Sequence, residues 1–316
     1  PCGSAVLVRN GAGRFQMLGG VIEENTGNYG AVFVKRGTAQ IAGGKIIKNT
    51  AKNNGGGVYI SSGTLNIIGK KDNTVEISDN SAGERGGGIY INDGRVSLKN
   101  VDITSNRTTN AKTTDVTMSA GGGIYANVGR LDIGEGTTIM NNSAVRGGGI
   151  YQRSTSTIHM IDGVISKNTA QMGGGVAQYP NAICKFLLMG GGVYDNLSKL
   201  SASGNDFYSR YEGTDPNYGK NSVVPQLTLI NAASMGNENY NAWKDDAYIK
   251  QKGEEGYQRL GELIGEGQYI IADITMSYNV DLTAAHYETE IAKTNLLTDL
   301  EVGSVTLTRS TNKGTE

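Results

Sequence analysis

Residue types that usually carry metal chemistry are scarce in this chain of 316 residues. It contains two cysteines, Cys2 and Cys184, and two histidines, His159 and His286. These four residues do not stand in the closely spaced pairs of a His/Cys zinc cluster, and the sequence contains no Asp-x-Asp-x-Asp-Gly calcium loop. We therefore expect no metal site and no cofactor.

Acid–base residues gather at one place, where Arg95, Arg130, Asp132 and His159 occupy outward positions of neighbouring repeats. Polysaccharide-cleaving enzymes need paired carboxylates, or calcium-binding carboxylates with a basic residue. This cluster offers one carboxylate, as a solvated surface would. We expect no catalytic residues and no enzyme activity, and a polysaccharide lyase or hydrolase stays open as the alternative.

Overall charge and hydropathy exclude two classes of partner. The 29 basic and 30 acidic residues give a net charge of −1, so the chain has no electrostatic footprint for nucleic acid. No apolar run is long enough to cross a membrane, and no leader follows Pro1. We expect no membrane insertion in this segment, and a mature product or an excised fragment.

Glycine, at 47 residues, is abundant because it belongs to a repeat. Gly-Gly-Gly triplets precede an aliphatic residue, and two degenerate copies stand upstream. The aliphatic positions are 26, 26, 31, 35, 26 and 26 residues apart, which indicates a period of 26 with two insertions. They are Val6, Val32, Val58, Ile89, Ile124, Ile150 and Val176.

Two further columns complete each period. An aliphatic residue precedes an asparagine by three positions in seven copies, from Ile22 and Asn25 to Val193 and Asn196. Between the columns, segments such as Leu65-Asn66-Ile67 alternate apolar and polar residues, as half-buried strands do. Three short strands per 26 residues predict an all-β fold, a right-handed parallel β-helix of about seven to eight coils. Glycine and asparagine then occupy the turns.

The pattern changes after Asn205, so we divide the chain into a β-helix over 1–235 and a small, β-rich C-terminal capping region over 236–316. A cap would cover the apolar coils and strand edges that an open end exposes. After Asn205 we expect a strand at 227–230 that closes an eighth coil of the β-helix. In the capping region we expect a short helix at 254–264 and strands at 269–276 and 302–308.

The cysteines fall on coils one and seven. Six steps of about 4.8 Å place them roughly 29 Å apart, far beyond the reach of a disulfide. We predict that they are not bonded to each other.

An aromatic column follows the first aliphatic column by one residue: Phe33, Tyr59, Tyr90, Tyr125 and Tyr151. If the aliphatic residues face inward, alternation turns these rings outward, where they would form a strip that binds ligands by stacking. The opposite orientation, with buried tyrosines, stays open because Gln152 and Gln178 would otherwise face the interior.

An insertion at 107–120 leaves the coil beside this column. Loops on a rigid scaffold often bind ligands, although a tolerated insertion explains the same sequence.

The motif Ile-x-x-Asn-(Ser/Thr)-Ala-x-x-Gly-Gly-Gly-(Ile/Val)-Tyr, as at 139–151, resembles the β-helix repeats of surface proteins of Gram-positive bacteria. It is more distantly similar to repeats of chlamydial polymorphic membrane proteins. The resemblance covers about residues 4–208 and includes no catalytic residues. It implies a secreted or cell-surface location and an adhesin-like role, with a host or bacterial surface glycan or protein as partner. A structural stalk or filament unit that associates end to end is the remaining alternative.

Overall fold

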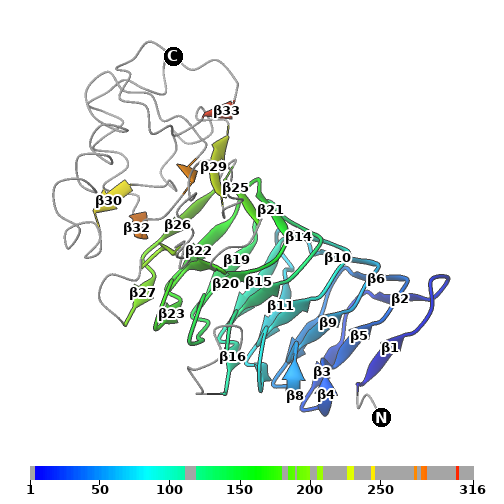
Figure 1. The fold of residues 1–316 in the computed structure, drawn as a ribbon. Helices are drawn as coiled ribbons and strands as arrows, with labels where there is room; N and C mark the ends of the chain where they lie inside the picture. Colours follow the sequence, from blue (N-terminus) through cyan, green and yellow to red (C-terminus); the bar gives the residue numbers. More distant parts are fainter. Residues whose placement is uncertain are drawn as a thin grey trace.

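A computed structural model describes residues 4–110, 119–179, 184–188, 191–199 and 205–208, together with five short strands further on. The chain winds into a parallel β-solenoid (Figure 1). Strands at equivalent positions of successive coils pair with one another and form the sheets that run along the solenoid. No helix occurs in these described ranges. The predicted all-β parallel solenoid is confirmed.

Sheet A begins each coil, and its eight parallel strands stand in register from one coil to the next. They are β1 (Val6–Val8), β5 (Val32–Val34), β9 (Val58–Ile60), β13 (Ile89–Ile91), β17 (Ile124–Ala126), β20 (Ile150–Gln152), β24 (Val176–Gln178) and β28 (Phe207–Tyr208).

Sheet B follows with eight parallel strands. They are β2 (Arg14–Met17), β6 (Thr38–Ile41), β10 (Thr64–Ile68), β14 (Arg95–Lys99), β18 (Arg130–Ile133), β21 (Thr157–Met160), β25 (Lys185–Leu188) and β29 (Gln226–Ile230). Strand β29 pairs parallel to β25, so the expected closure of an eighth coil is confirmed.

Sheet C contains seven parallel strands. They are β3 (Val21–Glu23), β7 (Lys45–Ile47), β11 (Val75–Ser78), β15 (Val101–Thr104), β19 (Thr138–Met140), β22 (Val164–Ser166) and β26 (Gly192–Tyr194).

Each period also contributes to a fourth stack, sheet D, which the prediction of three strands missed. Its members are β4 (Thr26–Tyr29), β8 (Thr50–Asn54), β12 (Ser81–Ala82), β16 (Arg107–Thr108), β23 (Thr169–Ala170) and β27 (Leu197–Ser198). Ser143 bridges β16 to β23, so the stack continues through coil five. Small and polar residues occupy these segments, so they lack the alternation of apolar and polar residues that indicates a strand.

Beyond the eighth coil the pairing changes direction. The strands β30 (Trp243–Asp245), β31 (Ile274–Thr275), β32 (Asn279–Leu282) and β33 (Ser304–Val305) pair antiparallel to their neighbours. β31 and β33 fall inside the two ranges expected to hold strands. The helix expected at 254–264 lies outside the described residues.

The main core fills the interior of the solenoid with aliphatic columns. The first residues of the sheet A strands, from Val32 to Val176, are fully buried together with the alternate residues of sheets B and C. The alternation of inward and outward residues also holds in the sheet A strands of coils six and seven, where Gln152 and Gln178 face inward and are buried. Gln178 Nε2 donates to Gln152 Oε1 at 3.1 Å, and Gln152 Nε2 donates to the carbonyl of Lys185 at 2.7 Å.

The asparagine column forms a continuous ladder of hydrogen bonds between sheets C and D. At Asn106, the amide Nδ2 donates to Asn142 Oδ1 of the next coil at 3.1 Å and to the carbonyl of Ile77 at 2.8 Å. The same pattern runs from Asn25 to Asn196, whose Nδ2 donates to Asp206 Oδ1 at 2.8 Å. The left-handed backbone lies one residue before the column, as at Ser105 with φ 57°, and not at the asparagine. The column was correctly predicted as structural, but its role is the ladder.

Cys184 is buried and free, in agreement with the prediction that it does not pair with Cys2. Cys2 itself lies outside the described residues. No helix of the described residues is long and apolar enough to span a membrane.

Candidate functional site

The aromatic column is a stack of rings along the outer side of sheet A. Tyr59, Tyr90, Tyr125 and Tyr151 stack with centroid separations of 4.9, 5.1 and 5.3 Å and interplanar angles of 15 to 23°. Phe33 closes the N-terminal end by meeting Tyr59 edge to face at 4.8 Å. The spacing follows the separation of strands in a sheet, so the stack is a direct product of the register.

The expectation that these rings face solvent is wrong. Tyr125 exposes 0% of its surface, Tyr151 1%, and Tyr90 and Phe33 6% each, whereas Tyr59 is partly exposed. The rings do point away from the main core, but they form a second apolar cluster that the returning chain covers. An alternation pattern reports which side of a sheet a residue faces and does not report what lies over that side.

The cover comes from the residues that precede the glycine triplets. Ala120 and Met172 belong to the tyrosine cluster, and the guanidinium of Arg85 lies 5.8 Å from the centroid of Tyr125. Gly121 turns the chain back with φ 67°, and a Cβ there would lie 2.9 Å from the Cα of Tyr125. The first glycine of the triplet therefore allows the turn to lie close against sheet A.

Burial has a chemical consequence for the phenols. Loss of hydration of the phenolate raises the pKa of Tyr59 and of Tyr125 to about 12, and the pKa of Tyr151 also rises well above its usual value for the same reason. Neutral, covered rings of this kind pack well and offer no open face for a sugar ring.

The charged cluster on sheet B forms as the sequence indicated. Asp132 accepts from Arg130 Nε at 2.6 Å and from Arg95 Nη2 at 3.1 Å, and His159 Nδ1 lies 3.5 Å from Asp132 Oδ1. Burial lowers the pKa of His159, as does the nearby Arg130, while Asp132 opposes the shift. Both carboxylate oxygens are thus engaged by guanidinium groups, and the described residues of this cluster supply no second carboxylate.

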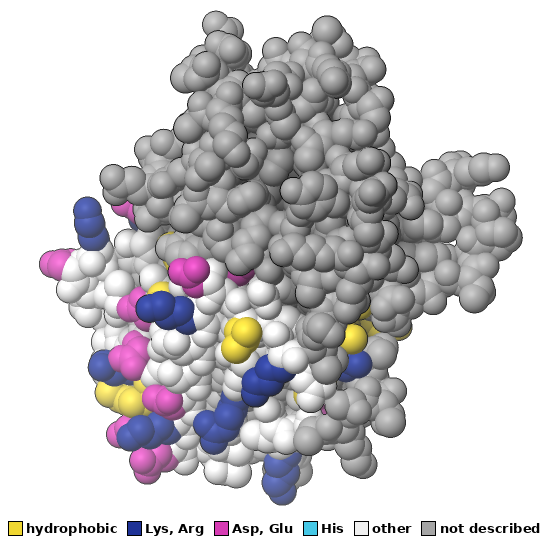
Figure 2. All heavy atoms as spheres, turned by 90° about the vertical axis from the view of Figure 1, so that its left-hand side faces the viewer, with side chains coloured by type: hydrophobic (Ala, Val, Ile, Leu, Met, Phe, Trp, Pro, Cys, Tyr) yellow, Lys and Arg dark blue, Asp and Glu magenta, His cyan; other side chains and the backbone are white. Residues whose placement is uncertain are grey.

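Other surface charges are mixed. Lys45 pairs with Glu76 at 2.7 Å, and Lys99 pairs with Glu135 at 3.0 Å. Figure 2 shows basic side chains interspersed with acidic ones on the described part of the face toward the viewer, with only scattered hydrophobic groups. No group of three or more His, Cys, Asp or Glu within the described ranges is arranged to hold a metal ion.

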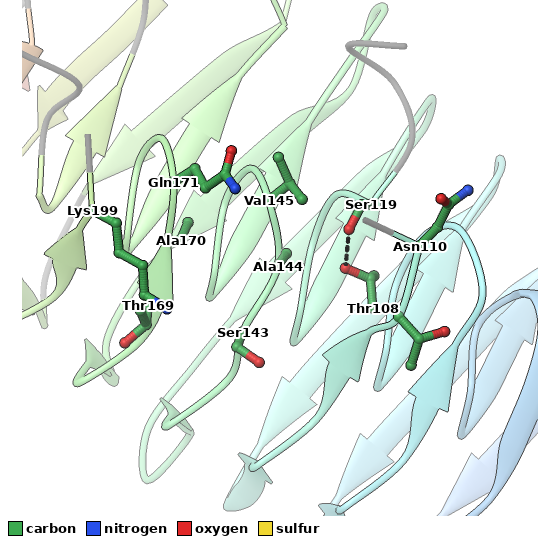
Figure 3. Close-up of a pocket in the computed structure, with 11 residues that line it drawn as sticks. Thr108, Asn110, Ser119, Ser143, Ala144, Val145, Thr169, Ala170, Gln171 and Lys199 are labelled. Atoms are coloured by element: carbon green, nitrogen blue, oxygen red, sulfur yellow. Dashed lines mark hydrogen bonds between the residues drawn. The ribbon is translucent and has the colours of Figure 1, made fainter. Parts of the chain in front are cut away.

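A groove on sheet D is the feature that the sequence did not locate. It has a volume of about 240 Å³ and extends along the solenoid axis over coils four to seven (Figure 3). Its lining consists of small and polar residues: Thr108, Thr109, Asn110, Ser119, Ser143, Ala144, Val145, Thr169, Ala170, Gln171 and Lys199.

The groove differs from the tyrosine stack and the charged cluster because several of its polar side chains have no hydrogen-bond partner among the described residues. Thr108 Oγ1 and Ser119 Oγ bond to each other at 2.9 Å. The side chains of Ser143, Thr169, Gln171 and Lys199 make no hydrogen bond or ion pair in the described part of the chain. Unpaired donors and acceptors that line a hollow are available to a ligand.

The 107–120 insertion is the sequence feature that lies next to the groove. Its ends contribute Thr108, Thr109, Asn110 and Ser119 to one end of the groove, and residues 111–118 lie outside the described residues. The remaining lining comes from sheet D, whose outward positions carry no recognisable motif.

Residues 74–92 match the family model described as the Chlamydia polymorphic membrane protein repeat. The matched segment contains β11, Asn80, the triplet 86–88 and β13, which are the parts that build the asparagine ladder and the cover of the tyrosines. No curated protein and no solved structure matches the chain. The match therefore supports the repeat architecture of this segment.

Proposed function

We propose that this chain is a non-catalytic β-solenoid region of a secreted or cell-surface bacterial protein with an adhesin-like role. Its partner is a glycan or a protein on a host cell or a neighbouring bacterium. The match to a repeat of membrane surface proteins and the solenoid fold support the location. A Gram-positive source rests on the resemblance of the repeat alone.

The observation that carries the binding role is the groove on sheet D. The tyrosine stack is largely covered, and both carboxylate oxygens of Asp132 are engaged by arginines. Only the groove combines a hollow with unpaired polar side chains among the three clusters.

Attachment of beads coated with the purified chain to host epithelial cells and to bacteria tests this proposal. Saturable attachment that soluble chain competes away is expected. Beads coated with an Ile139→Asp variant, whose core is disrupted, are the control. Absence of saturable attachment to any surface would refute the adhesin-like role.

A structural spacer is the second candidate, because the asparagine ladder and the tyrosine stack both run along the rod, and the amides of the ladder bond to one another from coil to coil. A spacer needs rigidity and no groove. Sedimentation velocity of the isolated chain distinguishes a filament unit, which associates end to end with rising concentration, from a monomer.

A further inference from the structure

We infer that the groove on sheet D binds a short acidic oligosaccharide. This inference rests on the proposed adhesin-like function and names the class of ligand. Three features of the groove carry it: the chemistry of its unpaired groups, the absence of a free strand edge in it, and the charge at its end.

The unpaired groups suit vicinal hydroxyls. Ser143 and Thr169 offer hydroxyls that both donate and accept, and Gln171 offers an amide that does the same. Ser143 and Thr169 stand in register on neighbouring coils, about 4.8 Å apart along the groove. A saccharide carries hydroxyls at comparable intervals, so each coil contacts a different part of an extended chain.

The backbone pairing of sheet D under the groove disfavours a peptide partner. A peptide that binds to a sheet adds a strand to an open edge, but here Ser143 pairs with Arg107 on one side and with Thr169 on the other. Ala144, Ala170 and Val145 are the apolar residues of the described lining, and Val145 is the largest of them. The described lining thus offers no large apolar side chains of the kind that form anchoring pockets for a peptide.

Charge selects an acidic sugar. Lys199 is exposed, is the only ionisable side chain among the described lining residues, and has no ion pair in the described ranges. Arg107, also exposed, pairs with Ser143 through its backbone but is not one of the residues that line the groove. A carboxylate on the ligand would therefore meet the Lys199 ammonium at the coil-seven end of the groove, whereas the described lining residues offer no competing carboxylate.

Calorimetric titration tests the inference with uronic-acid and sialic-acid oligosaccharides, each paired with its carboxyl-reduced counterpart. At least one acidic ligand should bind about tenfold more tightly than its reduced form. Lys199→Gln should weaken that binding by about fivefold, as expected for loss of one charge-assisted contact. Ser143→Trp should abolish binding because the indole fills the groove.

Two matched variants control for the fold and for general charge. Lys52 holds the position of Lys199 in an earlier coil, and Thr50 holds that of Ser143, both outside the groove and exposed. Lys52→Gln and Thr50→Trp should leave binding unchanged. Equal binding of acidic and reduced ligands, or full binding by folded Ser143→Trp, would overturn the inference. Cell attachment that survives Ser143→Trp would leave the adhesin-like role standing with another surface, whereas loss of all attachment by the unmodified chain would refute the role itself.

Discussion

Asn106→Ala should destabilise the solenoid by about 3 kcal/mol, because the substitution removes a rung from the middle of the asparagine ladder. Asn106 is fully buried. Its Oδ1 accepts from the backbone N–H and from Nδ2 of Asn80, both at 3.0 Å. Alanine leaves these two donors without a partner in a place that water does not reach. Each unsatisfied buried group costs about 1 to 3 kcal/mol, and partial relaxation favours the lower half of the sum.

Equilibrium urea denaturation followed by circular dichroism measures this loss. Asn106→Asp is the informative comparison, because a carboxylate still accepts from Asn80 but faces the Asn142 oxygen and the Ile77 carbonyl, to which asparagine donates. It should destabilise at least as much as alanine. At the end of the ladder, Asp206→Asn should cost less than about 1 kcal/mol, because the asparagine keeps the acceptor for Asn196. A loss below about 1 kcal/mol for both Asn106 variants would refute the view that the ladder holds the turns together.

Three other predictions concern the two cores. The double change Tyr90→Ser with Tyr125→Ser should lower stability by at least about 4 kcal/mol, because it empties a covered stack, and unaltered thermal denaturation would contradict the burial of the rings. Ile139→Asp should unfold the neighbouring coils, since an unpaired charge in the aliphatic column costs several kcal/mol, which proteolysis of the variant would reveal. Folding raises the pKa of Tyr59 and Tyr125 to about 12, whereas tyrosines of the unfolded chain ionise near pH 10. The free energy of unfolding should therefore be highest below pH 10 and should fall as the pH rises toward 12, because phenolates form more readily in the unfolded chain. Ultraviolet titration of tyrosinate, with both rings ionising at the ordinary pH near 10, would contradict that last expectation.

The sequence period was enough to predict the solenoid because every coil carries aliphatic residues at the same positions, and all of them must be buried. The aliphatic columns at Ile139 and Ile165 must be buried, and stacking the coils is the way to bury all of them at once. Alternation along the strand also predicts that the polar Gln152 faces inward, and Gln152 is buried.

Sequence alone did not reveal what covers the outer side of sheet A. Whether Tyr125 meets water depends on the path of the turn before it, and that path is set by Gly121 and by Ala120, neither of which is hydrophobic enough to signal a second core. The groove was missed for a related reason. Ser143 and Thr169 are ordinary surface residues in the sequence, and only stacking of separate coils brings them to one hollow.

The asparagine ladder gives the rod a polarity and makes its length adjustable. Each side-chain amide donates toward the next coil and accepts from the previous one, so any coil can follow any other in the same sense. Excision of the 26 residues 124–149 would join Gly123 to Ile150 and bring Asn106 against Asn168 with the same donors and acceptors. Duplication or loss of a whole period in the gene would thus lengthen or shorten the protein by about 4.8 Å at a time without a new fold having to be invented.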